Sequence, residues 1–202
     1  MNDPAVDLII FDLGRVLVDF DFKHVISGLK RHSELSEEQI KRYFEDTPLW
    51  DAFERGLVLP AEFFQNLQKD LRLEGLSFEK FTALWNSIFE EKRDTVALLS
   101  QLRSRYRLAM LSNVNQMHWE LIASRHAFMN WFDYPVASYA VGYRKPDAEI
   151  YRIVLRKADV SPQRAVFIDD VESHILAARA IGIRAHQFTT ADRLRQDLAE
   201  LL

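Results

Sequence analysis

Residues 6–12 read VDLIIFD, an apolar run that ends directly at the carboxylate of Asp12. A run of this length without alternation is typical of a strand buried on both faces of a parallel sheet. Four later segments have the same form, a short apolar run followed by polar residues, and the last of them is the weakest: Arg107–Leu111, Ala165–Ile168, Ile183–Phe188 and Tyr134–Tyr139. Together with Val6–Phe11, they predict a parallel sheet.

Amphipathic helices are predicted between these strands. The segment Thr95–Tyr106 places Val96, Leu99 and Leu102 at helical spacing. Three further segments have helical patterns, and the last is followed by Gly182, a residue type that often ends helices: Gln116–Phe128, Ala148–Ala158 and Ser173–Ile181. Strands that alternate with helices of roughly 10–15 residues indicate βαβ units. The sequence therefore predicts an α/β core with three layers and a doubly wound parallel sheet.

One long segment interrupts this alternation. From about Phe20 to Phe89 no convincing strand is present, and four helices are predicted instead: Phe22–Arg31, Ser36–Glu45, Pro60–Leu71 and Ser77–Phe89. Ser36 and Gln39 form a plausible capping box, and Pro60 suits the first turn of a helix. We therefore expect two domains, an α/β core made of residues 1–18 and 91–202 and a small all-helical domain made of residues 19–90.

Composition excludes several classes of protein. The chain has 202 residues and a net charge of −4, and it lacks the basic stripe typical of nucleic-acid binders. It has no cysteine, which rules out disulfides, thiolate catalysis and cysteine metal sites. The N-terminal apolar run has no basic leader and is broken by Asp7, and no segment reaches the roughly 18 apolar residues needed to span a bilayer. We expect a cytoplasmic protein without nucleic-acid or membrane partners, as a monomer or weak homodimer.

Polar side chains follow the predicted strands at the points where they end. Asp12 follows the first strand, Ser112 and Asn113 the second, and Asp169 and Asp170 the run AVFI. Ligands bind beyond the carboxyl ends of the strands in open α/β sheets, so these groups should share one site with the nearby Lys145. Clustered carboxylates repel each other unless a cation lies among them, and oxygen ligands favour Mg²⁺. A phosphoryl group would suit the metal, the ammonium and the hydroxyl.

At this point a resemblance can be recognised. Four segments in order resemble the four motifs of the haloacid dehalogenase-like superfamily: Phe11-Asp12-Leu13-Gly14-Arg15-Val16-Leu17, Leu111-Ser112-Asn113, Arg144-Lys145-Pro146-Asp147 and Phe167-Ile168-Asp169-Asp170. The helical insert resembles the type-1 cap of this superfamily, and the segment from Trp50 to Gly56 resembles a recurrent cap segment of one phosphatase branch. The resemblance covers residues 11 to about 182.

The resemblance implies a role for each matching residue. Asp12 matches the nucleophile, which forms an aspartyl-phosphate that water hydrolyses. Ser112 matches the phosphate-binding hydroxyl, with the backbone N–H of Asn113 as a helper, and Lys145 matches the lysine that offsets charge. Asp170 matches the metal-binding carboxylate, with Asp169 as a second ligand or a supporting residue. Three further expectations complete the site: a metal ligand from Asp12, another from the backbone carbonyl of Gly14, and a phosphate contact from Arg15.

The family's phosphatases usually have an aspartate two residues after the nucleophile, where this chain has Gly14. That aspartate serves as general acid and base, which contributes roughly 10²–10⁴-fold to rate. The resemblance still favours a Mg²⁺-dependent phosphatase that acts on a small phosphorylated metabolite, with a sugar phosphate as the first expectation. Two alternatives stay open: a catalytically impaired protein that binds Mg²⁺ and phosphate, and a 2-haloacid dehalogenase. His174 is a lesser site candidate. Candidates for substrate selection lie in or beside the helical insert: Lys23, His24, Trp50 and Arg55.

Overall fold

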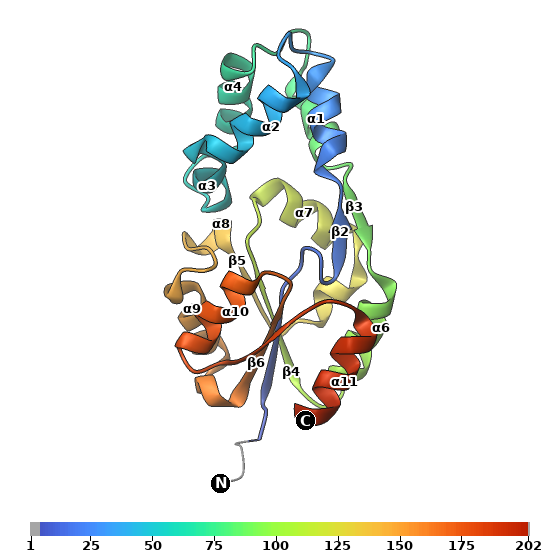
Figure 1. Cartoon of the computed structure of the whole chain (residues 1–202), viewed down its shortest axis with the longest axis vertical. Helices are drawn as coiled ribbons and strands as arrows, with labels where there is room; N and C mark the ends of the chain where they lie inside the picture. Colours follow the sequence, from blue (N-terminus) through green and yellow to red (C-terminus); the bar gives the residue numbers. More distant parts are fainter. Residues whose placement is uncertain (1–4, 202) are drawn as a thin grey trace.

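A computed structural model describes the backbone of residues 5–201 and the side chains of residues 5–199. Its central sheet has five parallel strands (Figure 1). Their order is β5 (Tyr134–Ala137), β4 (Arg107–Ser112), β1 (Leu8–Phe11), β6 (Ala165–Asp169) and β7 (Arg184–Gln187). All five predicted strands are confirmed, with ends that differ by a few residues. β1 lies at the centre, between β4 and β6, and the carboxyl ends of these three strands meet at one edge.

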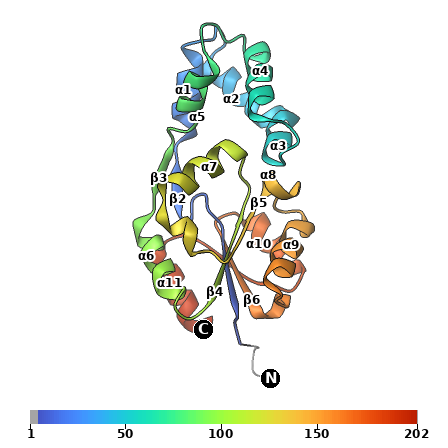
Figure 2. The same cartoon turned by 180° about the vertical axis from the view of Figure 1, so that it is seen from behind.

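Helices cover both faces of this sheet, which confirms the predicted three layers (Figures 1 and 2). β1 shows why both faces are covered: Ile9 and Phe11 belong to one apolar core cluster, and Leu8 and Ile10 to the other. The first cluster is covered by α6 (Arg93–Leu102), α7 (Gln116–Arg125), the 3₁₀ segment η1 (Ala127–Trp131) and α11 (Ala191–Leu201). The second is covered by α9 (Ala148–Ala158) and α10 (Glu172–Ala180). Two short turns complete the core, α8 (Ser138–Val141) and η2 (Pro162–Arg164).

A block of five helices stands above the carboxyl edge of the sheet (Figure 1). It comprises α1 (Phe22–Lys30), α2 (Glu37–Asp46), α3 (Pro48–Glu54), α4 (Pro60–Asp70) and α5 (Phe78–Trp85). We call these residues, 22–85, the helical block. Its own core is rich in aromatic side chains, which pack against each other. The predicted capping box of Ser36 and Gln39 is present, and Pro60 occupies the first turn of α4.

The structure corrects the prediction at the edges of this block. Two short strands, β2 (Val18–Phe20) and β3 (Phe89–Glu91), pair antiparallel where the block joins the sheet domain, and the sequence reading found neither. The helix predicted to reach Phe89 ends at Trp85, because the chain becomes extended to form β3. α3 was also missed, since its seven residues are too few to show a helical period.

The predicted domain borders at residues 19 and 90 fall inside these two strands, and the division into two domains stays a prediction. Residues 1–4 and 202 of the predicted core lie outside the described residues. Among the helices that are described, none has the length and apolar character needed to cross a bilayer.

Candidate active site

Three carboxylates meet at the carboxyl edge of the sheet. Asp12 directly follows β1, Asp169 ends β6, and Asp170 follows it. The backbone N–H of Asp12 donates to the carbonyl of Ile168 at 2.9 Å, which fixes the end of β1 against β6. One oxygen from each carboxylate lies within 4.8 Å of the other two, so the three could hold one metal ion.

The ammonium of Lys145 joins two of these carboxylates. Its Nζ lies 2.8 Å from Asp12 Oδ1 and 2.6 Å from Asp169 Oδ2, and the side chain is almost fully buried. The side chain of Asn113 holds the loop in place through both backbone groups of Lys145. Its Oδ1 accepts from the lysine N–H at 2.7 Å, and its Nδ2 donates to the lysine carbonyl at 2.9 Å. Asn113 was predicted to help through its backbone, and the side-chain role is a finding of the structure.

Burial and charge set the protonation of this cluster. Burial raises the pKa of Asp12 to about 6, with Lys145 opposing the shift and Asp169 adding to it. Burial also acts to raise the pKa of Asp169, but Lys145 and His174 outweigh it and hold the value at about 2. The pKa of Asp170 is raised by its burial and by the charge of Asp169. Burial lowers the pKa of Lys145, yet the two carboxylates raise it above its ordinary value. At neutral pH the cluster thus holds one ammonium among several carboxylates.

Residues that follow β6 in the chain also hold the side chain of Asp169. His174 Nδ1, on α10, lies 3.0 Å from each carboxylate oxygen, and the N–H of Val171 donates to Oδ1 at 2.8 Å. These contacts and Lys145 orient Asp169 firmly. The structure therefore brings His174 into contact with the cluster, although through Asp169.

Ser112, Gly14 and Arg15 lie around this cluster in different ways. Ser112 ends β4 and is nearly buried, and within the described part of the chain no hydrogen bond engages its hydroxyl. At Gly14, an added Cβ would come 3.2 Å from the Phe20 ring, so a larger residue there would have to push this ring by a few tenths of an ångström. Arg15 is exposed, lies 4.0 Å from Asp19 and stacks over the ring of Phe20.

A cavity of about 500 Å³ opens beside the carboxylates, between the sheet edge and the helical block. Gly14, Ser112 and Asn113 line its floor. Two of the four predicted selectivity residues, Lys23 and Trp50, also line it. His24 is exposed outside the lining, and Arg55 is engaged elsewhere.

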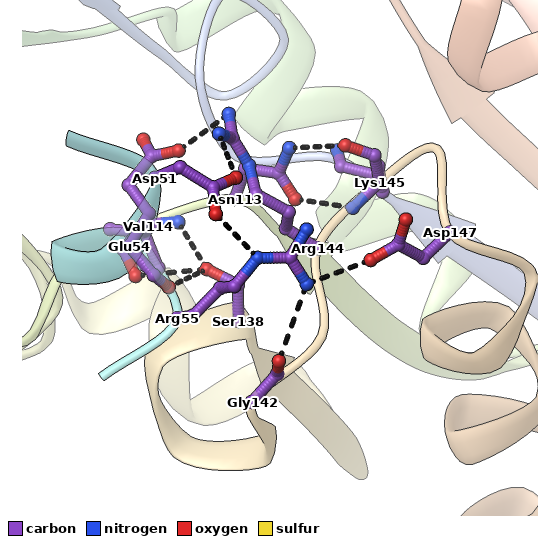
Figure 3. A network of polar contacts seen from close by, with 10 residues as sticks. All are labelled: Asp51, Glu54, Arg55, Asn113, Val114, Ser138, Gly142, Arg144, Lys145 and Asp147. Carbon is purple, nitrogen blue, oxygen red and sulfur yellow. Dashed lines mark hydrogen bonds and ion pairs between the residues drawn. The ribbon is translucent and has the colours of Figure 1, made fainter. Parts of the chain in front are cut away.

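A network of ion pairs fastens α3 to the core beside this cavity (Figure 3). Arg144, next to Lys145, pairs with Asp51 at 2.8 Å and with Glu54 at 2.7 Å. Arg55 pairs with Asp147 at 2.8 Å, and the Ser138 hydroxyl donates to the carbonyl of Glu54 at 2.6 Å. Sequence reasoning missed this network, because it joins residues far apart in the chain.

At Gly56 the backbone of the helical block lies directly against the backbone of α8. Its φ is +70°, and an added Cβ would lie 2.1 Å from the backbone oxygen of Tyr139. Only glycine fits both the left-handed backbone and this contact. The segment from Glu54 to Gly56 therefore forms the floor of the helical block where it meets α8.

Glu54 has a buried carboxylate that belongs to the lining of the cavity. The residue lines the cavity and is only 7% exposed. Burial raises its pKa to about 7; Arg144 opposes the shift, and Asp51 adds to it. The sequence reading named Glu54 only as part of a motif, and no local pattern marked it as buried.

Comparisons with known proteins identify the family of this chain. The family model of the haloacid dehalogenase-like hydrolases matches residues 6–182. A D-ribitol-5-phosphate phosphatase from Bacteroides thetaiotaomicron is 28% identical, over 96% of this chain and 97% of its own. A sesquiterpene phosphatase from Aspergillus oryzae is 25% identical, over 96% and 95%.

Solved structures give the same assignment. An enzyme of the same family from Bacteroides thetaiotaomicron, in complex with magnesium and inorganic phosphate, is 26% identical with a TM-score of 0.82, over 92% of this chain and 95% of its own. An L-2-haloacid dehalogenase from Xanthobacter autotrophicus, at 18% identity and a TM-score of 0.64 over 96% and 83%, shares the fold. The chain belongs to the haloacid dehalogenase-like hydrolases.

Proposed function

We propose that the chain is a Mg²⁺-dependent phosphatase that cleaves small phosphate monoesters through an aspartyl-phosphate on Asp12. The observation that supports this most directly is the buried ammonium of Lys145 bridging Asp12 and Asp169, next in the chain to residues that line a cavity, Leu13 and Gly14. An ammonium in this place offsets negative charge on the nucleophile and on an incoming phosphoryl group.

The residues present fit a hard divalent cation. Three carboxylates share the cluster with a single ammonium, so the protein itself leaves part of their negative charge uncompensated. Burial raises the pKa values of Asp12 and Asp170, and the charge of Asp169 raises them further, so a cation among these groups would favour their ionised forms. Asp12, Asp170 and the backbone carbonyl of Gly14 would hold Mg²⁺, with Asp169 beside them. When bound, the ion would supply charge stabilisation for the phosphoryl oxygens.

The chain's own residues would perform the remaining work. Both Lys145 and the N–H of Leu13 contact Oδ1 of Asp12, which leaves Oδ2 for attack on phosphorus. The new bond forms as the ester P–O bond breaks and the alcohol leaves, and water then hydrolyses the aspartyl-phosphate. The Ser112 hydroxyl and the N–H of Asn113 would donate to phosphoryl oxygens, and Arg15 would contribute charge at the rim. The relatives act on different phosphates by name, so a sugar phosphate is one candidate substrate among others.

The alternatives have less support. A dehalogenase of this fold would not need the trio of carboxylates, and the likeness to solved dehalogenases shows the fold alone. The impaired binder is favoured only by Gly14.

Hydrolysis of p-nitrophenyl phosphate with and without Mg²⁺ tests the proposal. This leaving group departs with little help from a general acid, so the gap at Gly14 should not hide activity. We expect turnover that requires Mg²⁺ and that EDTA abolishes reversibly. Folded protein that binds phosphate with Mg²⁺ but releases no nitrophenol would instead establish the impaired binder.

A further inference from the structure

The walls of the cavity are apolar over most of their surface. They come from the helical block, from its connecting strands and from the sheet edge, and the aromatic members are Phe20, Phe22, Phe44, Trp50 and Phe89. Phe22, Phe44 and Trp50 contact each other edge to face, with ring centroids 5.1–6.0 Å apart, so this wall is a packed surface. The volume of the cavity, about 500 Å³, lies in the range of small-molecule sites, roughly 300–1,000 Å³.

Apart from the hydroxyl of Ser112, which the proposed function assigns to the phosphate, the polar side chains in the interior of this cavity already have partners within the protein. Both ring nitrogens of His118 are used, one by Asn115 and the other by the carbonyl of Trp85, each at 3.0 Å. The amide of Asn113 is used by the backbone of Lys145, and Glu54 is paired with Arg144.

The other charged residues in the lining, Arg15, Asp21, Lys23, Lys41 and Glu45, are all exposed and lie at the rim. A sugar inside the cavity would therefore lose its hydrogen bonds with water and find few replacements, and each unmade bond of a buried polar group weakens binding.

We infer that the cavity takes the body of an amphiphilic phosphate monoester, an apolar alcohol whose phosphate reaches the carboxylate cluster. This inference rests on the proposed function for the phosphate end. The two ends are placed side by side, because Gly14, Ser112 and Asn113 belong both to the cavity lining and to the surroundings of Asp12.

Binding of n-alkylphosphonates, from methyl to octyl, tests the cavity without turnover. With Mg²⁺ present, calorimetry should show affinity rising by roughly fourfold per buried methylene until the cavity is filled. Phe44→Ala should flatten this dependence. Tyr43→Ala, on the same helix but outside the lining, should retain it.

Equal affinity along the series, with tighter binding or faster turnover of sugar phosphates, would overturn the inference. A rising series without any phosphatase activity would support the cavity's role and refute the proposed function, so the two failures are distinguishable. Circular dichroism of Phe44→Ala separates lost selectivity from unfolding.

A second inference comes from the missing acid at Gly14. An added Cβ there would lie 3.2 Å from the ring of Phe20, a tight contact, and the glycine itself offers no proton donor in its side chain. Glu54 supplies a buried carboxylate in the lining of the same cavity, from the helical block. It pairs at 2.7 Å with Arg144, the neighbour of Lys145 in the chain, and the ammonium of Lys145 contacts Asp12, so a single ion pair links Glu54 to the loop at the reacting centre.

We propose that Glu54 is the general acid and base of the reaction, again on the basis of the proposed phosphatase function. As the P–O ester bond breaks, its electron pair goes to the leaving oxygen, which takes the proton of Glu54 and departs as the alcohol. The carboxylate of Glu54 then takes a proton from water as the water oxygen attacks phosphorus and the bond to Asp12 breaks. A pKa near 7 allows both steps at neutral pH.

Glu54→Gln distinguishes this role from a structural one. We expect the variant to lose about 10²-fold or more in kcat/KM with an alkyl phosphate, a poor leaving group, and much less with p-nitrophenyl phosphate, because kcat/KM reports the phosphorylation of Asp12 and leaves out the later hydrolysis that both substrates share. Asp51→Asn is the matched control, since it removes a carboxylate from the same network but lies outside the cavity lining. Its effect should be equal for both substrates. An equal loss for both substrates in Glu54→Gln would show that Glu54 only fastens α3 to Arg144, and would overturn the proposal.

Discussion

We expect Asp12→Asn to abolish hydrolysis of p-nitrophenyl phosphate while the protein stays folded. Loss of a catalytic nucleophile costs roughly 10⁴–10⁶-fold in kcat, because the remaining groups cannot replace the covalent step. The fold should not suffer. Burial raises the pKa of Asp12 to about 6, so its charge at neutral pH is held against a desolvation cost that a neutral amide avoids. We expect a steady-state rate at background and a urea midpoint equal to or above that of the wild type.

The matched control is Asp94→Asn, which changes the same side chain at an exposed site on α6. It should keep full activity and the wild-type urea midpoint. Turnover that persists in pure Asp12→Asn protein, above the level that wild-type contamination explains, would place the nucleophile elsewhere.

Most of the central sheet was readable from the sequence, because its strands are buried on both faces and stand out as continuous apolar runs. The strands β2 and β3 were not readable. Each has three residues, of which one is charged in β2 and two are charged in β3, and each strand pairs with a partner about seventy positions away. The predicted elements also end with the last strand and do not include α11, which follows it.

The same contrast holds for the site. Asp12, Ser112 and Asp169 could be identified because each stands at the end of a strand, and parallel strands bring their ends together. The contacts that complete the site run between distant segments. Neither the ring of Phe20 over Gly14 nor the burial of Glu54 beside Arg144 leaves any local pattern in the sequence. Such contacts depend on how the helical block sits on the core.

Lys145→Met should be both inactive and strongly destabilised. The substitution leaves Asp12, Asp169 and Asp170 together with no cation among them. Removal of one partner from a buried ion pair lowers the free energy of unfolding by roughly 3–5 kcal/mol, since the remaining charge is uncompensated. Urea denaturation followed by circular dichroism at pH 7, in EDTA so that metal does not contribute, measures this difference. Lys157→Met, at an exposed site on α9, is the matched control and should unfold like the wild type.

The pH dependence distinguishes charge from lost packing. Without the ammonium, the carboxylates of the folded variant take up protons more readily than those of the unfolded chain. Their folded pKa values then lie above the unfolded ones, so the variant gains stability as the pH falls from 7 to 5. The difference in the free energy of unfolding between the wild type and Lys145→Met should become smaller over this pH range. A packing defect would leave this difference constant.

The double variant Asp12→Asn/Lys145→Met removes one of the stranded carboxylates and should recover part of the loss. If the double variant is no more stable than Lys145→Met, the lysine stabilises the fold through the packing of its buried methylene groups. Its charge would then serve the reaction and not the stability of the fold.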